Sequence, residues 1–148
     1  MSPRKDKSFL AGLRRRKTIA LPRQQRRKNL DGTPAPNWTE RAFARQHLAL
    51  ARAVIYDPPS LIITRTKERR YTADYLFRRS DGKNCYIEVK GTYKLGSEDR
   101  ARLAWEIAAE KNKSAVFVWA VMQKNKSFKL EIWEQGGKSI THPDTLPI

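Results

Sequence analysis

The stretch "YTADYLFRRSDGKNCYIEVKG", residues 71–91, decides the expected fold, because it is typical of two β-strands joined by a tight turn. Its aromatic and β-branched residues favour extended backbone, and Asp81 and Gly82 in its middle suit a hairpin turn. The outer ends of the strands carry the charged groups of Asp74, Glu88 and Lys90. We therefore predict a hairpin over residues 71–79 and 85–91 with charged side chains at its open end.

The register of this hairpin determines which charged groups meet. Side chains alternate along a strand, so Glu88 and Lys90 point to one face while Ile87 and Val89 point to the other. A three-residue loop places Asp74 opposite Lys90 and diagonal to Glu88. A two-residue loop breaks this register and a bulge restores it, so the sequence leaves the register open. Facing residues lie about 5 Å apart between Cβ atoms, which is close enough for one shared site.

Two carboxylates at that distance repel each other unless a cation lies between them. Oxygen ligands without His or Cys favour Mg²⁺, with Mn²⁺ as a substitute. The spacing of Asp74 and Glu88 therefore predicts a divalent metal site. The alternative is a cross-strand salt bridge of either carboxylate with Lys90, and exposed pairs of that kind contribute only about 0–1 kcal/mol.

Upstream of the hairpin, residues 37–56, "NWTERAFARQHLALARAVIY", predict a helix that Pro58 ends. Its expected inner face comprises Phe43, His47, Leu50 and Val54, with His47 as a packed core histidine. Glu40 falls on the same face, where its carboxylate is expected to point into a cleft near the core. Asn37 three residues before Glu40 also forms a capping-box pattern, so the sequence leaves two roles for this Glu.

The remaining segments complete an α/β pattern. "SLIITRT" (60–66) predicts a strand, Ser97 is placed to cap a second helix, and "SAVFVWAVM" (114–122) predicts a strand buried on both faces. The apolar stripe of the second helix is expected at Leu103, Ala104, Ile107 and Ala108. "SFKLEIWE" (127–134) alternates as a half-buried strand, and two glycines end it. The order of helix, three strands, helix and two strands predicts an α/β sandwich with a mixed sheet flanked by helices.

Charge is the second strong feature of this 148-residue chain, whose formal net charge is +16. Residues 1–36 hold 11 Lys or Arg against two Asp, so we expect a basic flexible arm and linker before one domain over residues 37–148. Clustered cations favour a nucleic-acid partner. A membrane partner is not expected, because no long apolar run or lipidation signal occurs. A lone Cys85 excludes an internal disulfide, and the chain start lacks a signal-peptide pattern, so we expect a cytosolic protein.

A family resemblance adds to this interpretation. "YTADYLF" followed by "YIEVKG" resembles the paired motifs of the PD-(D/E)xK nuclease superfamily, in which an Asp begins one hairpin strand and Glu-x-Lys ends the next. The order of a helix with Glu40, the hairpin and "GTYKLGSEDRARLAWEIAAEKNKSAVFVWAV" is similar to the phage endonuclease I family of Holliday-junction-resolving enzymes, over about residues 37–121. Ala73 stands where the motif has Pro, a departure that concerns the subfamily more than the chemistry.

The resemblance implies a restriction-endonuclease-like core and metal-dependent hydrolysis of DNA. It implies metal binding by Asp74 and Glu88, with the Val89 carbonyl oxygen as a further ligand. Glu40 would be another acidic member of the catalytic site, and Lys90 would lie near the attacking water. It also implies a homodimer acting on branched DNA in a bacterial or phage-infected cell.

Several alternatives stay open at this point. Lys94, Arg100 and Arg102 follow the motif closely and are expected to hold phosphates beside the scissile bond, or else to form an exposed helix face. The four tryptophans, Trp38, Trp105, Trp119 and Trp133, are expected to be core residues or partly buried platforms rather than residues that stack on bases. The protein as a whole could be a superfamily nuclease without junction specificity, a nuclease acting on RNA, or a nucleic-acid-binding protein without catalytic activity.

Overall fold

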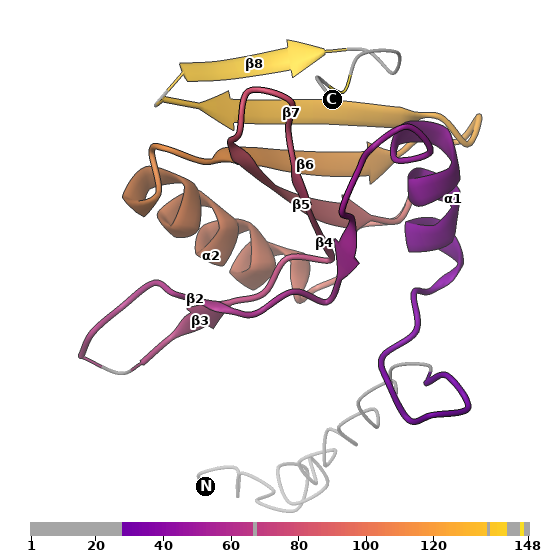
Figure 1. Cartoon of the computed structure of the whole chain (residues 1–148), viewed down its shortest axis with the longest axis horizontal. Helices are drawn as coiled ribbons and strands as arrows, with labels where there is room; N and C mark the ends of the chain where they lie inside the picture. Colours follow the sequence, from indigo (N-terminus) through magenta and orange to yellow (C-terminus); the bar gives the residue numbers. More distant parts are fainter. Residues whose placement is uncertain (1–27, 67, 136, 142–145, 147–148) are drawn as a thin grey trace, which may run out of the picture.

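The computed structural model describes residues 28–66, 68–135, 137–141 and 146, so most of the predicted basic arm lies outside the described residues. The elements in chain order are α1 (Trp38–His47), β1 (Ile55–Tyr56), β2 (Leu61–Ile62), β3 (Arg70–Tyr71), β4 (Tyr75–Arg78), β5 (Asn84–Lys90), α2 (Glu98–Lys111), β6 (Val116–Met122), β7 (Phe128–Glu134) and β8 (Gly137–Thr141) (Figure 1).

Six strands form one sheet in the order β1-β4-β5-β6-β7-β8, and β2 and β3 form a separate two-stranded ribbon. Within the larger sheet β5 and β6 pair in parallel, whereas the other neighbours pair antiparallel. The helix α2 connects the two parallel strands, as a parallel crossover requires. The predicted mixed sheet flanked by helices is confirmed at this level.

The sheet separates two cores because neighbouring side chains on a strand point to opposite faces. On one face Phe43 of α1 packs with Ile87, Val118 and Leu130, all of them buried. On the other face Trp105 of α2 packs with aromatic residues such as Phe117 of β6. Burial of each large apolar side chain contributes about 1.5–3 kcal/mol. The central strand β6 serves both cores, which confirms the interpretation of residues 114–122 as a strand buried on both faces.

The first helix is shorter than predicted, because α1 ends at His47 and residues 55–56 belong to a strand. Leu50 and Val54, expected on the inner face, are 83% and 37% exposed. The chain extends there because Tyr56 pairs with Tyr75 of β4, and this tertiary pairing overrides the helical pattern. His47 is buried and its ring lies 4.9 Å from that of Phe43, in agreement with a packed core histidine.

The hairpin of β4 and β5 has a three-residue loop, Ser80-Asp81-Gly82, with Tyr75 paired to Ile87 and Arg78 to Asn84. Gly82 adopts a φ of +83°, the left-handed conformation that closes such loops. Only glycine takes this conformation without strain. The loop covers residues 80–82, one residue earlier than the loop over 81–83 that a pairing of Asp74 with Lys90 requires. The paired residues end at Tyr75 and Ile87, and the Asp74 N–H donates to the Ile87 carbonyl oxygen, so Asp74 lies next to this pair and not opposite Lys90.

Three further differences concern the second half of the chain. Ser97 has helical φ and ψ angles and its side chain makes no capping hydrogen bond, so the predicted cap is wrong. Leu103 is 52% exposed, and the most buried residues of α2 are Trp105, Ala108 and Ala109, because the helix is rotated to bury the larger indole. The strand β8, which begins at Gly137, was not predicted, since two glycines indicated only the end of β7.

Candidate active site

Asp74 lies immediately before β4 and is fixed against β5 by two hydrogen bonds. Its backbone N–H donates to the Ile87 carbonyl oxygen at 2.9 Å. Its carboxylate accepts from the backbone N–H of Val89, with 2.8 Å between Val89 N and Asp74 Oδ2. A short acidic side chain at the start of a strand can reach such a neighbouring N–H. The carboxylate of Asp74 is thereby held beside the residues that flank Glu88.

Glu88 and Lys90 alternate along β5 and share the face that α2 covers. Glu88 is buried, and its Oε1 lies 2.6 Å from Nζ of Lys90. The Lys90 ammonium also lies 5.1 Å from the ring centre of Trp119, the β6 residue paired with Glu88. A part-buried salt bridge of Glu88 with Lys90 is therefore present, but it lies within β5 and not across two strands as the sequence analysis considered.

The charges at the open end of the hairpin are not balanced. The pKa of Asp74 is raised well above its ordinary value, first by burial, then by the negative charge of Glu88 and that of Glu40. The Val89 N–H and the Lys90 ammonium lower this pKa but do not outweigh the other causes. An isolated pair of oppositely charged groups would have the reverse effect on the carboxyl group. The site therefore concentrates more negative charge than Lys90 offsets.

Glu40 lies in the first turn of α1 and completes the predicted capping box with Asn37. Its carboxylate accepts from the Asn37 backbone N–H at 2.7 Å, while its own N–H donates to the Asn37 side chain at 3.0 Å. The Tyr56 hydroxyl donates to the same carboxylate at 2.9 Å, and the side chain is buried. Because the charge of Glu40 also raises the pKa of Asp74, the residue combines a capping position with electrostatic contact to the site.

Tyr71 is a member of the site that sequence reasoning did not identify. It is buried on β3, and its pKa is raised well above the ordinary value by burial and then by the negative charges of Glu88 and Asp74. A signal for it existed, since the buried Tyr71 and Ala73 alternate with the polar residues Thr72 and Asp74. The phenol adds a neutral polar group beside the carboxylates.

The three predicted phosphate-binding residues differ in their surroundings. Arg100 is exposed, and Lys94 forms an exposed ion pair with Asp99 at 2.7 Å. Arg102 instead makes two hydrogen bonds to Glu131, at 2.6 and 3.0 Å, and its guanidinium carbon lies 5.1 Å from the ring centre of Trp119. Because the guanidinium group of Arg102 is already paired with carboxylates of the protein, Arg102 is not favoured as a primary phosphate ligand.

Asp74 and Glu88 fit a hard cation by ligand type, because Mg²⁺ is commonly held by one or two carboxylates and keeps several waters. The gathering of negative charge around Asp74 supports the same fit. Within the described residues, however, no group of three or more His, Cys, Asp or Glu side chains is arranged to hold a metal ion. A cation here would depend on these two carboxylates, backbone oxygen and water.

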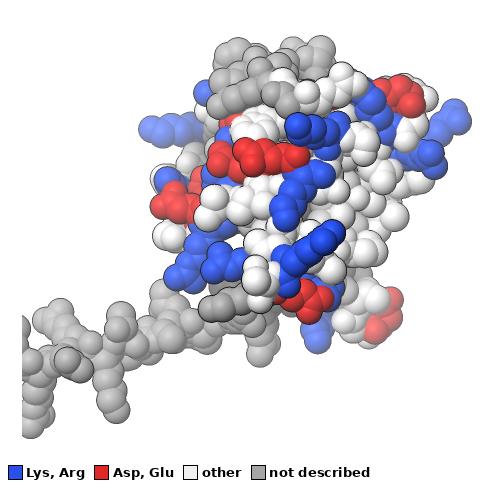
Figure 2. All heavy atoms as spheres, turned by 90° about the vertical axis from the view of Figure 1, so that its left-hand side faces the viewer, with Lys and Arg blue, Asp and Glu red and all other residues white. Residues whose placement is uncertain are grey.

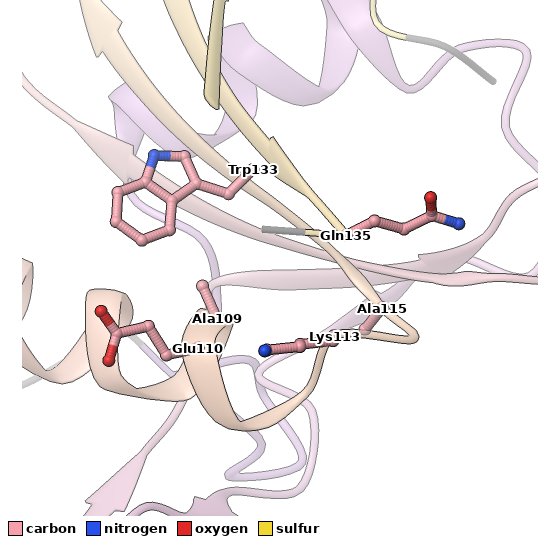
Figure 3. Close-up of a pocket in the computed structure, with 6 residues that line it drawn as sticks. All are labelled: Ala109, Glu110, Lys113, Ala115, Trp133 and Gln135. Atoms are coloured by element: carbon pink, nitrogen blue, oxygen red, sulfur yellow. The ribbon is translucent and has the colours of Figure 1, made fainter. Parts of the chain in front are cut away.

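Other surface features are less suited to chemistry. A hollow of about 560 Å³ at the end of α2 is lined by Ala109, Glu110, Lys113, Ala115, Trp133 and Gln135 (Figure 3). The polar ends of Glu110 and Gln135 point away from each other there. Figure 2 shows Lys and Arg side chains spread over one side of the molecule with carboxylates between them, without a single dominant patch.

The chain matches no protein-family model, no curated protein and no solved structure. Among the helices that the structure describes, none has both the length and the apolar character needed to cross a membrane.

Proposed function

We propose that this protein is a metal-dependent endodeoxyribonuclease of the PD-(D/E)xK type, and that it acts on branched DNA. The observation that carries the proposal is that the Asp74 carboxylate is held against the Val89 N–H, next to Glu88, with the pKa of Asp74 raised by burial and by its acidic neighbours. Two carboxylates held together against their mutual repulsion are stabilised by a divalent cation. A sheet has little structural reason to maintain such an arrangement.

Each residue has a role that follows from its position. Asp74 and Glu88 would hold Mg²⁺, or Mn²⁺ in its place, with the Val89 carbonyl oxygen as a further ligand. When bound, the ion polarises a phosphate oxygen and acidifies a water molecule. Lys90, positioned by Glu88 and Trp119, orients the attacking water or offsets negative charge in the transition state. Glu40 keeps the site acidic from the start of α1.

The substrate proposal rests on charge and on the family resemblance. A net charge of +16 favours association with the phosphate backbone and makes affinity dependent on salt. A homodimer would present two sites to two arms of a four-way junction, so that the second contact becomes intramolecular. Linear duplex offers no such second contact.

A nucleic-acid-binding protein without catalytic activity is the second candidate. It is favoured by the Lys90–Glu88 salt bridge, which already offsets one carboxylate, and by the lack of a third metal-binding side chain among the described residues. In that case the charged hairpin end would serve only to place cations near phosphate.

The deciding experiment incubates the full chain with labelled four-way junction, three-way branched, single-stranded and linear DNA, with Mg²⁺, Mn²⁺ or EDTA. Sizing of the protein in parallel gives the oligomeric state. We expect paired cuts near the branch point that need metal and are absent in Asp74→Asn. Equal cutting of junction and linear DNA would reject junction selectivity, and the absence of metal-dependent cutting of DNA or RNA would favour the second candidate.

A further inference from the structure

A groove runs along α1 beside the candidate active site. It is a hollow of about 660 Å³ lined by Pro36, Trp38, Arg41, Ala44, Arg45 and Tyr75, and we name these six residues the α1 groove. Its walls combine aromatic rings with guanidinium groups. Apolar surface beside unneutralised cations is the combination that nucleic-acid strands use, since bases stack and phosphates pair.

Trp38 gives the groove an exposed aromatic surface. It is 49% exposed, whereas Trp105 and Trp119 are 0% and 5% exposed. Trp38 is thus a partly buried platform, the second of the two positions expected for the tryptophans, and not a core residue. The Lys126 ammonium lies 5.0 Å from the ring centre of Trp38, which brings a third cation to the groove.

The cations of the groove are available to a ligand. Arg41 and Arg45 follow Trp38 at positions i+3 and i+7 of α1, so all three side chains lie on one helical stripe. Both Arg side chains are exposed, and neither forms a salt bridge with any residue that the structure describes. Arg79 and Arg102, in contrast, each contact two carboxylates.

The groove is joined to the candidate site through Tyr75. Tyr75 lines the groove and directly follows Asp74 in the chain. The Tyr75 hydroxyl donates to the backbone carbonyl oxygen of Glu40 at 3.1 Å. A strand lying in the groove would therefore run close to Asp74 and Glu40.

We infer that the α1 groove binds a single-stranded segment of nucleic acid, with one base stacked on Trp38 and the adjoining phosphates paired with Arg41 and Arg45. The inference deepens the proposed function, because it names an unpaired strand as the part of the substrate held beside the site. Stacking on an indole is tolerant of sequence, so the groove reads the unpaired state rather than the bases.

The test measures binding of labelled oligo(dT), oligo(rU) and linear duplex DNA to the full chain in EDTA, so that no cutting is required. Trp38→Ala should weaken binding of the single strands about tenfold or more and leave duplex binding almost unchanged. Trp38→Phe, which keeps an aromatic face, should restore most of the affinity. Thermal melts of each variant establish that the fold is retained.

A charge-matched pair of variants tests the cations. Arg41→Ala with Arg45→Ala should reduce the salt dependence of single-strand binding, by about 0.7 in the log–log slope for each lost phosphate contact. Lys111→Ala with Lys113→Ala removes the same charge at the end of α2 and should change the slope far less. Oligo(dT) and oligo(rU) in parallel decide between DNA and RNA as the source of the strand.

The outcomes separate this inference from the proposed function. Unchanged single-strand binding in Trp38→Ala, or equal effects of the two double variants, would overturn the groove while metal-dependent cutting still supported the nuclease. Loss of single-strand binding in Trp38→Ala by a protein that cuts no substrate would support the groove and reject the nuclease.

Discussion

The two ends of the β4–β5 hairpin shift the pKa values of their carboxyl groups in opposite directions. At the turn, Arg79 contacts Asp81 and Glu134, and Lys83 Nζ lies 2.6 Å from Glu134 Oε1. Hydrogen bonds from Arg79 lower the pKa of Asp81 to about 2, and those from Arg79 and Lys83 lower the pKa of Glu134 to about 2. The turn thus favours its carboxylates in the ionised form.

At the open end, burial and acidic neighbours raise the pKa of Asp74 instead. Only Lys90 contributes an opposing charge among the causes of that shift, against the two acids Glu88 and Glu40. The difference indicates that the turn is organised for stability and the open end for binding a cation. Removal of one carboxylate charge should therefore have different effects on DNA cutting and on stability at the two ends.

The largest expected contrast is in DNA cutting. Glu88→Gln and Lys90→Ala should each lower the cutting rate by about 10²–10⁴-fold, because they remove a metal ligand and the group near the water. Glu134→Gln at the turn should leave the rate within about twofold. The measurement is single-turnover cutting with Mg²⁺, beside DNA binding in EDTA, which should be nearly equal for all three. Full activity of Lys90→Ala would contradict the comparison.

Glu40→Gln tests whether Glu40 acts on the candidate site or only caps α1. A Gln at this position can still complete a capping box, so the free energy of unfolding should change by less than about 1 kcal/mol. Loss of the charge should nevertheless slow cutting by about tenfold or more if Glu40 acts on the site. A variant that keeps its activity but melts at a lower temperature would show that Glu40 is only a cap.

Stability without metal should rise when the acidic end loses a charge. The pKa of Asp74 is higher in the folded than in the unfolded chain, so its stabilising contribution is present at acidic pH and is lost as pH rises through the folded pKa. Asp74→Asn should therefore raise the melting temperature at neutral pH in EDTA, by about 2–4 °C for each kcal/mol released.

The same melts should show opposite behaviour at the turn. The lowered pKa of Glu134 gives stability above its ordinary value of 4.5 that is lost as pH falls through about 2. Glu134→Gln should cost about 1 kcal/mol at most at neutral pH, since solvent screens this pair. An increase in stability for Glu134→Gln, or a decrease for Asp74→Asn in EDTA, would invalidate the assignment of the two ends.

The smallest effect is expected at the loop itself. Gly82→Ala should lower the free energy of unfolding by about 1 kcal/mol, because alanine at a φ of +83° is strained although the space around it is open. Gly82→Asn, which tolerates this conformation better, should cost less. Urea unfolding measures both, and a change in cutting rate by either variant would indicate that the turn influences the site.

The sequence predicted those features that depend on local periodicity. The strands over residues 84–90, 116–122 and 128–134 and the second helix follow from apolar patterns, and the capping box at Glu40 follows from Asn37. The charged cluster was also predictable, because alternation along β5 places Glu88 and Lys90 on one face. Metal binding and catalysis by these residues stay predictions.

The remaining differences depend on tertiary contacts that local patterns do not contain. The first helix ends early because residues 55–56 pair with β4, and the hairpin register follows the backbone conformation of Gly82. The alternation before Asp74 indicates that Tyr71 is buried but not that it lies beside Glu88. That position of Tyr71 and the contacts of Arg102 with Glu131 join segments far apart in the chain, so no spacing rule indicates them. The exposure of Trp38 likewise depends on what packs beside it.

The parallel pairing of β5 with β6 bears on the order in which the molecule folds. The hairpin of β4 and β5 needs only a short loop to close, so Asp74 can meet Glu88 early. Trp119 reaches Glu88 only when the whole of α2 has crossed over and Ile87 pairs with Val118, a slower event because loop closure is longer. The acidic pair is therefore expected to form in water and to become enclosed later, which would let a divalent ion enter before the crossover covers the site.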